Sequence, residues 1–444
     1  MTTTALREID VARPCRKWPR FSRHKPAGMA WIHEVPEHWR IEKLEHVAAV
    51  RFSSVNKKTE EGEIPVRLCN YTDVYNRDLI SDDIDFMQAT ATAAEIERFT
   101  LKRGDVLITK DSEEWDDIAV PAYVAEDISG VLCGYHLALI RPYSTEIDGA
   151  FLSRAFTADG IRQQFHIAAN GITRFGLPNR AIAGALFPVP PLDEQRAIAG
   201  FLDRETARID ELIAKKRRLI ELLREKRQAL ISRAVTKGLD PNVPMKPSGI
   251  DWVGEVPEDW ELKRLKYIAA IRAGENITAL AFDEGGEYPV YGGNGIRGCT
   301  SYYTHDGDFV LIGRQGALCG NVHRVRGKFW ASEHAAVATC REGVHVDWFA
   351  HLVETMDLKR YSETAAQPGL ALERVVRLRI PFPDTATQRE IAAFVDGESA
   401  KIDKLAKRIE EGVFRLLDYR TALITAAVTG QIDVRNYREE APCP

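Results

Sequence analysis

The stretch PVPPLDEQRAIAGFLDRETARIDELIAKKRRLIELLREKRQALISRAVT at residues 188–236 returns as PFPDTATQREIAAFVDGESAKIDKLAKRIEEGVFRLLDYRTALITAAVT at residues 381–429. The two copies align without a gap at an offset of 193, and 21 of 49 positions are identical. Prolines crowd both entrances, but none interrupts the rest of either copy, so each copy is predicted to form one long helix. An internal repeat of this length decides how the other segments are interpreted.

Apolar residues follow a 3,4 spacing along both copies, interrupted at the same place by Glu205 and Glu398. This spacing is typical of a coiled-coil seam, in which each helix buries its apolar stripe against a partner helix. We expect the two copies to be each other's partner. Because two equivalent halves of one chain pack most simply about a twofold axis, the helices are expected to run antiparallel. The predicted core residues of the pair are Ile198, Leu202, Ile209, Leu212, Leu219, Leu223, Leu230, Ile391, Val395, Ile402, Leu405, Ile409, Leu416 and Leu423.

A second repeat precedes each helix. Residues 25–51 return at 246–272 with 13 of 27 positions identical. The blocks between the repeated segments, 52–187 and 273–380, show little mutual similarity, and the first is 28 residues longer. Short strand-like runs, separated by glycine and aspartate turns and mixed with helical segments, predict a compact mixed α/β domain in each block.

The expected fold is therefore α+β. Two mixed α/β domains are separated by two long antiparallel coiled-coil helices, in a pseudo-twofold internal repeat. The expected boundaries are an N-terminal extension at 1–24, a first domain at 25–187, a first long helix at 188–238, a linker and second domain at 239–380, a second long helix at 381–430 and a C-terminal tail at 431–444.

Composition excludes several classes of protein. The balance of 45% hydrophobic and 28% charged residues is that of a globular chain, and no apolar run approaches the ~18 residues of a membrane span. The N-terminus lacks a signal-peptide core, so a cytoplasmic location without membrane contact is expected. Seven scattered cysteines with no CxxC pair argue against a disulfide framework and a zinc ribbon, and the eleven histidines show no metal-ligand spacing.

Several motifs occur in order and in duplicate. The lead KPxGxxWxxEVPExW is followed by the helix entrance PVPPLDEQRAIA at 188–199 and the helix exit AVTKG at 234–238, and the second copy supplies TQREIA at 387–392 and AVTG at 427–430. In these features the chain resembles the specificity subunits of type I restriction-modification enzymes over nearly its whole length from about residue 25. The second entrance departs from the pattern, because PDTAT stands at 383–387 where the first copy has PPLDE.

The resemblance implies that the two blocks are target-recognition domains, each reading one half of a bipartite double-stranded DNA target, with the helices as spacer. Because the blocks differ, the target is expected to be asymmetric. Two recognition domains on a rigid spacer suit half-sites about one helical turn, ~34 Å, apart. The implied partners are two modification (methyltransferase) subunits that methylate adenine N6 and restriction subunits that translocate and cleave DNA.

The resemblance also implies a non-catalytic chain without a cofactor of its own. S-adenosylmethionine, ATP and Mg²⁺ would belong to the partner subunits. In agreement, the chain lacks the Asn/Asp-Pro-Pro loop of an adenine methyltransferase and the GxxxxGK[ST] loop of a translocase. The glycine cluster at 291–298 has no following helix in a βαβ context, so it is interpreted as a turn-rich loop.

The two blocks share short echoes such as the strand-like runs GDVLI at 104–108 and GDFVL at 307–311. Residues with major-groove chemistry lie near these echoed strands and in glycine-punctuated loops. The candidate DNA-binding residues are Lys110, Asn170, Thr173, Arg174, Asn294, Arg297, Arg314 and Gln315.

Charge leaves two other hypotheses open. The first block holds 13 basic and 21 acidic residues, and the second holds 11 basic and 13 acidic residues. An excess of acidic residues disfavours binding to DNA phosphates. One alternative is therefore a coiled-coil scaffold with two protein-binding heads and no DNA role. The other is a metal-dependent nuclease built on the acidic run at 111–117.

Overall fold

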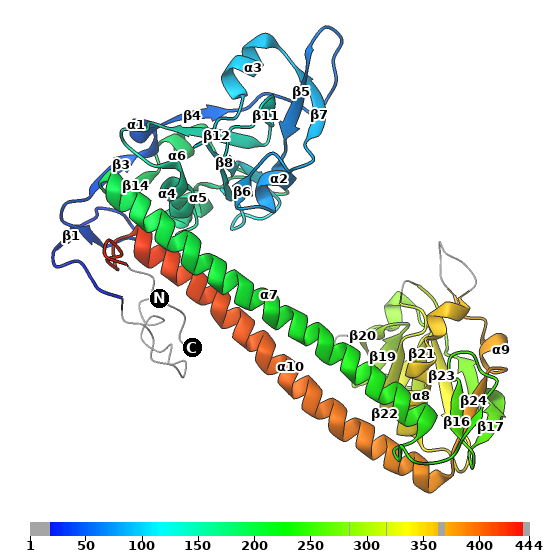
Figure 1. The fold of residues 1–444 in the computed structure, drawn as a ribbon. Coiled ribbons are helices and arrows are strands. Elements are labelled where there is room, and N and C mark those ends of the chain that lie inside the picture. Colours follow the sequence, from blue (N-terminus) through cyan, green and yellow to red (C-terminus); the bar gives the residue numbers. More distant parts are fainter. Residues whose placement is uncertain (1–17, 284, 317, 363–368, 438–444) are drawn as a thin grey trace. The chain divides into compact units, whose positions relative to one another are not determined.

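The computed structural model describes residues 18–283, 285–316, 318–362 and 369–437. It divides into two compact units, of which unit 1 comprises residues 1–215 and 412–444 and unit 2 comprises residues 216–411 (Figure 1). Both boundaries fall inside long helices, α7 (Leu192–Lys237) and α10 (Thr385–Val428), so each unit contains one half of each helix. The expected N-terminal extension and C-terminal tail lie partly outside the described residues.

Unit 1 carries two sheets. A five-stranded sheet has the strand order β4 (Ala48–Phe52), β12 (Leu137–Pro142), β8 (Val106–Thr109), β10 (Pro121–Val124) and β6 (Leu79–Ile80). A three-stranded sheet has the order β11 (Val131–Cys133), β5 (Ile64–Cys69) and β7 (Met87–Ala91). The remaining pairs are β1 (His24–Pro26) with β2 (Glu34–Pro36), β3 (Arg40–Lys43) with β14 (Leu186–Val189), and β9 (Asp111–Ser112) with β13 (Phe175–Gly176). Its short helices are α1 (Leu44–Val47), α2 (Tyr71–Tyr75), α3 (Ala93–Phe99), α4 (Gly149–Phe156), α5 (Asp159–Ala168) and α6 (Asn179–Ala183).

Unit 2 carries one larger sheet. Its strand order is β18 (Ala269–Ala273), β23 (Ala335–Cys340), β21 (His305–Gly313), β22 (Val322–Ala331), β19 (Tyr288–Gly292) and β20 (Gly295–Thr300). Two-stranded pairs join β15 (Met245–Pro247) to β16 (Glu255–Pro257) and β17 (Glu261–Arg264) to β24 (Arg379–Phe382). The helices besides α7 and α10 are α8 (Val346–Thr355), α9 (Leu372–Val375) and the 3-10 helices η1 (Leu265–Tyr267), η2 (Ala279–Ala281) and η3 (Leu358–Tyr361).

The two units share a set of corresponding strands and differ in the strands that are added to it. The antiparallel order β4–β12–β8 of unit 1 corresponds to β18–β23–β21 of unit 2, and the lead strand pairs with the strand before the long helix in both. Beyond these shared strands, unit 1 extends the sheet with β10 and β6 and adds a second sheet, whereas unit 2 extends it with β22, β19 and β20. The predicted α+β fold with long helices is confirmed.

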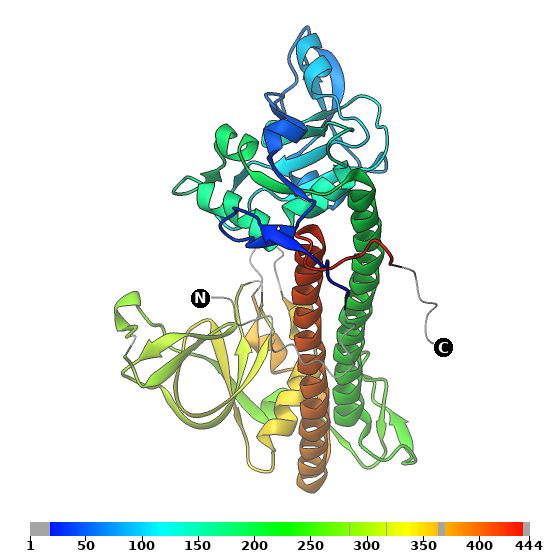
Figure 2. The same cartoon turned by 90° about the vertical axis from the view of Figure 1, so that its left-hand side faces the viewer.

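In unit 1 the second half of α10 lies beside the first half of α7 in both views, and side chains of both enter one core (Figure 1, Figure 2). The helices therefore run antiparallel there. Arg420 of α10 also donates to Asp210 of α7, with Nε to Oδ1 at 3.0 Å. In unit 2 the other halves share a second core, and Arg224 of α7 pairs with Glu410 of α10 at 3.5 Å.

The buried stripe of each helix repeats every 11 residues. It consists of Ile198, Ile209, Ile220 and Ile231 in α7 and of Ile391, Ile402, Val413 and Ile424 in α10, each at most 9% exposed. Eleven residues complete three turns at about 3.67 residues per turn, close to the 3.6 of a straight helix, whereas a heptad frame drifts by about 20° per repeat. The stripe therefore stays on one side of the helix without the left-handed supercoil of a heptad coil.

This period corrects the predicted 3,4 frame. Leu212, Leu219 and Leu405 are 43%, 45% and 46% exposed, because the heptad frame carries these positions off the buried face. Three other predicted core residues are half-buried, namely Leu223, Leu230 and Leu416. The remaining eight are buried, namely Ile198, Leu202, Ile209, Ile391, Val395, Ile402, Ile409 and Leu423.

One buried glutamine fastens each long helix to its sheet domain. In unit 1, Gln195 donates from Nε2 to the Pro190 carbonyl at 2.8 Å and to the Glu146 carbonyl at 3.1 Å, and its Oε1 accepts from the Asp148 amide at 2.7 Å. The repeat-equivalent Gln388 makes the same three kinds of bond in unit 2. Both glutamines are fully buried, so the entrance motif fixes each domain on its helix.

Gln388 bonds the Pro383 carbonyl at 2.8 Å, the Gly343 carbonyl at 3.4 Å and the His345 amide at 2.8 Å. The divergent second entrance supplies its own cap, because Asp384 Oδ1 accepts from the amides of Ala386 and Thr387. The departure from the first copy therefore keeps both the helix start and the glutamine contacts.

Each long helix also ends at a left-handed glycine, although the two glycines differ by one position in the repeat. Gly238 ends α7 at φ +75°, and a Cβ there would lie 3.4 Å from the Trp260 ring. Gly430 ends α10 at φ +72°, where a Cβ would lie 2.2 Å from Pro36 and 3.2 Å from the Trp39 ring. A left-handed glycine is needed at both exits because the chain turns against the lead of the same unit.

Candidate nucleic-acid interface

In unit 1 three separate segments meet at Lys110, directly after the end of β8. The amide of Leu177 donates to the Lys110 carbonyl at 2.9 Å, and the Lys110 amide donates to the His136 carbonyl at 3.1 Å. Asn170 and Gly176 exchange two backbone hydrogen bonds, which close the loop between them. The structure thus brings the four predicted residues of this unit, Lys110, Asn170, Thr173 and Arg174, to one edge of the domain.

Lys110 is held by its neighbours. Its Nζ lies 2.9 Å from Asp111 Oδ2 and 4.8 Å from the centre of the Tyr135 ring. Asp111 Oδ2 also lies 2.8 Å from His136 Nδ1. Burial opposes ionisation of Asp111, but the hydrogen bonds from His136 and Lys110 outweigh it, so the pKa of Asp111 is lowered. The three side chains form a fixed polar group rather than three independent ones.

The loop at 170–174 is the exposed part of this edge. Thr173 and Arg174 are exposed, and Ile172 between Gly171 and Thr173 is 95% exposed. Asn170 is exposed as well, but its Nδ2 donates to the Ala168 carbonyl at 3.0 Å, so part of its hydrogen-bonding capacity stabilises the loop. Thr173 and Arg174 are therefore the two polar residues of this loop, besides Asn170, whose side chains are exposed.

Aromatic side chains surround the same edge. Tyr71 and Tyr75 stack with ring centres 5.4 Å apart, and Trp115 and Tyr135 are each 51% exposed. Burial raises the pKa of Tyr71, and the hydrogen bond with Ser112 opposes this effect in part. Exposed rings beside cationic side chains suit stacking on bases or packing against sugar.

Unit 2 forms the same backbone junction at Arg314, which follows β21. The amide of Leu370 donates to the Arg314 carbonyl at 2.9 Å, and the Arg314 amide donates to the His334 carbonyl at 2.8 Å. Gln315 forms an isolated bridge with Gly369. The junction is therefore Lys110–His136–Leu177 in one unit and Arg314–His334–Leu370 in the other.

The side chains at the second junction differ from those at the first. Gln315 is exposed, and its Oε1 lies 3.0 Å from His334 Nδ1. Gly293 packs closely here, since a Cβ on it would lie 3.0 Å from the Gln315 carbonyl oxygen. The next residue, Asn294, accepts from Asn321 Nδ2 at 2.7 Å and is exposed. Arg314, Gln315 and Asn294 are thus brought together.

Arg297 is placed differently. Its side chain passes over Gly292, where a Cβ would lie 2.3 Å from Arg297 Cδ, and its guanidinium lies 5.9 Å from the Phe282 ring centre. No contact with Arg314 or Gln315 is recorded within the described residues. Arg297 is exposed, so it can reach a ligand on the β19–β20 side of the sheet.

His136 and His334 are the residues that sequence reasoning missed. His136 stands directly before β12, which pairs with β8, and His334 stands directly before β23, which pairs with β21. The side chain of His136 hydrogen-bonds Asp111, and that of His334 hydrogen-bonds Gln315. Their position before corresponding strands is the signal that could have found them, but it becomes visible only when the strands are paired.

The acidic run at 111–117 borders the junction of unit 1. Asp111 is bonded by Lys110 and His136, and Asp117 accepts a hydrogen bond from the Tyr75 hydroxyl, which contributes to raising the pKa of Tyr75 to about 12. Among the described residues, no group of three or more histidine, cysteine or carboxylate side chains is arranged to hold a metal ion. In the same part of the chain, no helix has the length and apolar character of a membrane span.

Comparison with known proteins relates this chain to one group. Residues 257–412 match the family model of the type I restriction modification DNA specificity domain. The chain is 44% identical over 153 residues to the type I restriction enzyme EcoprrI specificity subunit of Escherichia coli, covering 34% of this chain and 37% of that protein. It is 25% identical over 262 residues to a putative type I restriction enzyme MjaX specificity subunit of Methanocaldococcus jannaschii, covering 58% and 59%. These matches span less than two thirds of each relative.

Two solved structures share the fold. One, from work on the assembly and conformational transition of the type I R-M system, covers 90% of this chain and 100% of its own at a TM-score of 0.71 and 16% identity. The other, the HsdS subunit of Thermoanaerobacter tengcongensis, covers 90% and 98% at a TM-score of 0.51 and 17% identity. The resemblance to type I specificity subunits, predicted from the duplicated motifs, is confirmed.

Proposed function

We propose that this chain, whose residues 257–412 match the type I restriction modification DNA specificity domain, is a non-catalytic DNA-recognition subunit of a type I restriction-modification complex. Each unit reads one half of a bipartite, asymmetric DNA target. The partner subunits carry out adenine N6 methylation or ATP-dependent cleavage, and they supply S-adenosylmethionine, ATP and Mg²⁺. The complex acts in the cytoplasm, where its DNA substrate lies.

The observation that carries the proposal is the pair of equivalent junctions with different side chains. Lys110 and Arg314 occupy the same backbone position, bonded to a histidine segment on one side and a pre-helix segment on the other. Around Lys110 the accessible groups are Thr173, Arg174 and aromatic rings, whereas around Arg314 they are Gln315 and Asn294. A constant frame that presents variable polar groups suits direct readout of bases, in which arginine or lysine contacts guanine and glutamine or asparagine contacts adenine.

The long helices suit a split target. A helix of 46 residues is about 69 Å long at 1.5 Å per residue, a length that suits a spacer between two half-sites. A stiff spacer fixes the number of unread base pairs between two half-sites. The different length and strand content of the two domains support half-sites that differ in sequence.

The helix pair also offers a place for two copies of a modification subunit. Leu212 and its repeat-equivalent Leu405 are 43% and 46% exposed, and both lie off the buried stripe. A large apolar side chain exposed at the same place in both copies suits two equivalent partners. Modification subunits bound there would contribute phosphate contacts that the acidic domains provide poorly.

The proposal is tested by reconstitution with the cognate modification subunit. The purified chain alone is expected to transfer no methyl group, and the complex is expected to methylate one split sequence. Substitution of Arg174 is expected to relax the motif in one half-site and substitution of Gln315 in the other, by about 1–3 kcal/mol of discrimination each.

Methyl transfer by the isolated chain would contradict the non-catalytic role. The rival function, a scaffold with two protein-binding heads, predicts that the complex shows no salt-dependent, sequence-specific retention of DNA. The nuclease hypothesis predicts that Asp116→Asn and Asp117→Asn together abolish a cleavage activity of the chain itself.

A further inference from the structure

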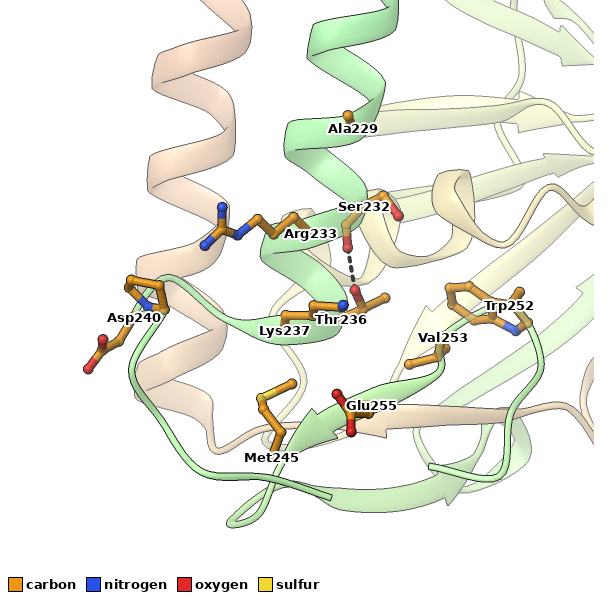
Figure 3. Close-up of a pocket in the computed structure, with 11 residues that line it drawn as sticks. Ala229, Ser232, Arg233, Thr236, Lys237, Asp240, Met245, Trp252, Val253 and Glu255 are labelled. Carbon is orange, nitrogen blue, oxygen red and sulfur yellow. Dashed lines mark hydrogen bonds between the residues drawn. The ribbon is translucent and has the colours of Figure 1, made fainter. Parts of the chain in front are cut away.

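An open pocket of about 620 Å³ lies in unit 2 between the end of α7 and the β15–β16 hairpin. The last turns of α7, with Ser232 and Thr236, line one side, and Met245, Val253 and Glu255 line the other (Figure 3). None of these residues belongs to the junctions at Lys110 and Arg314, so the pocket is separate from the candidate nucleic-acid interface.

Through the internal repeat, unit 1 contains a second copy of this site, and that copy is covered. In unit 1 the corresponding site, at the end of α10 and the first lead, is covered by the first turn of α5. The Asp159 amide donates to Thr425 Oγ1 at 3.1 Å. A Cβ on Gly160 would lie 2.6 Å from Ile32 Cγ1 and 3.2 Å from the Trp31 carbonyl oxygen. The start of α5 therefore packs against the first lead at a distance that requires glycine at this position.

The residues that α5 covers have direct counterparts in the open pocket. At the repeat offsets, Thr425 corresponds to Ser232, Ile32 to Val253 and Trp31 to Trp252, and all three counterparts line the pocket. The helix ends are built alike, because Thr236 Oγ1 donates to the Ser232 carbonyl at 2.6 Å and Thr429 Oγ1 donates to the Thr425 carbonyl at 2.6 Å.

The two sites differ in what covers them. In unit 1 the ten-residue α5 follows α4, whereas in unit 2 the first helix after α8 among the described residues is the four-residue η3. No hydrogen bond to the Ser232 hydroxyl is recorded from the described part of the chain. Within the described residues, the acceptor that holds a helix amide in unit 1 is therefore present in unit 2, but no helix amide donates to it.

The open site of unit 2 differs in charge from the covered site of unit 1. Arg233 and Lys237 stand where the covered site has Ala426 and Gly430. Both are exposed, and no ion pair is recorded for either within the described residues. Asp240 also lines the pocket, and Glu255 corresponds to Glu34 of the covered site, so the two added cations are the feature that distinguishes it.

We propose that this pocket binds the first turn of an α-helix of a partner protein. The turn carries an acidic residue followed by glycine, in the manner of Asp159 and Gly160. The backbone amide at the acidic position donates to Ser232 Oγ, the glycine packs on Val253, and acidic side chains of the first turn pair with Arg233 and Lys237. Acidic residues are also the ones that stabilise the start of a helix. Because unit 1 covers its own site, one chain binds one such helix.

The test uses a fluorescent peptide with the sequence of residues 157–169, TADGIRQQFHIAA, and the full chain, with binding followed by fluorescence polarisation. Saturable binding is expected. Ala229→Trp, which fills the pocket from an exposed position, is expected to weaken binding at least about tenfold, whereas Ala214→Trp at another exposed alanine of α7 leaves it unchanged. Circular dichroism and melting of both variants check that each is folded.

A second peptide distinguishes packing in the pocket from helix formation. Replacing the glycine that corresponds to Gly160 with alanine makes the peptide more helical but adds the Cβ that the packing excludes. The alanine peptide is expected to bind at least about tenfold more weakly than the original. Equal or tighter binding of the alanine peptide, unchanged binding to the Ala229→Trp variant, or no saturable binding of the original peptide would each overturn the proposal.

Discussion

Replacing Gln195 with leucine tests how the sheet domain of unit 1 is held on its helix. Leucine keeps most of the side-chain volume, so the substitution removes the amide group without opening a large cavity. It leaves the Asp148 amide and the carbonyls of Pro190 and Glu146 without their partner. Because Gln195 is fully buried, water cannot replace these bonds without local opening.

The magnitude follows from the three bonds, whose donor–acceptor distances are 2.7, 2.8 and 3.1 Å. A net hydrogen bond contributes about 1 kcal/mol, and each buried group left unpaired costs about 1–3 kcal/mol. Neighbouring losses are not additive, so we expect Gln195→Leu to lower the free energy of unfolding by about 2–4 kcal/mol. Gln388→Leu is expected to have a similar effect in unit 2.

The assay is urea denaturation of the full chain followed by circular dichroism. Hydrogen exchange at residues 146–148 and 343–345 shows which unit each variant loosens. Gln228→Leu is the control, because Gln228 is exposed on the same helix, and it is expected to change stability by less than about 0.5 kcal/mol. A Gln195→Leu variant within about 0.5 kcal/mol of the original chain, with exchange at 146–148 unchanged, would refute the reasoning.

Three further predictions concern the helices. The 11-residue stripe predicts that Ile209→Ala or Ile402→Ala lowers the free energy of unfolding by about 2–4 kcal/mol, whereas Leu212→Ala or Leu405→Ala lowers it by less than about 1 kcal/mol. Thermal denaturation in which the leucine variants lose more stability than the isoleucine variants would favour the heptad frame. Leu212→Arg with Leu405→Arg is expected to abolish co-elution of the modification subunit at unchanged chain stability, and an intact complex would remove these leucines from the partner surface. Burial opposes ionisation of Asp396, but hydrogen bonds from Arg324 and His351 outweigh it and lower its pKa. This depressed pKa stabilises the fold above the unfolded-state pKa of about 3.9, and the contribution is lost as pH falls through the folded-state pKa. Asp396→Asn should therefore reduce the loss of stability on acidification between about pH 5 and 3, and an unchanged acid profile would contradict this role.

Much of the fold could be predicted from the sequence because its largest elements are duplicated. The proline-bounded copies at 188–236 and 381–429 predicted helices that the structure begins at Leu192 and Thr385. The phase of the buried face was harder to obtain. A 3,4 frame and an 11-residue frame share Ile198, Ile209, Ile391 and Ile402, and they diverge from the middle of each helix onward. There Leu212 and Leu219 are as apolar as the isoleucines beside them.

The candidate interface was only partly accessible to sequence reasoning. Lys110 and Arg314 could be found because the strands before them echo each other, but the partners that hold them come from distant segments. His136 and Asp111 lie 25 residues apart, and their pairing follows from the antiparallel register of β12 on β8. The role of Gln195 was likewise hidden, since a glutamine near the start of a long helix is ordinarily a surface residue.

The central claim is that two equivalent junctions with different side chains read two different half-sites. It is tested most directly by sequencing DNA methylated by the reconstituted complex, with the original chain and with Gln315→Ala. The account predicts an asymmetric motif in two parts separated by a fixed unread gap, and a variant whose motif is relaxed in one part only. An unbroken or palindromic motif, or one that the substitution alters in both parts equally, would contradict it.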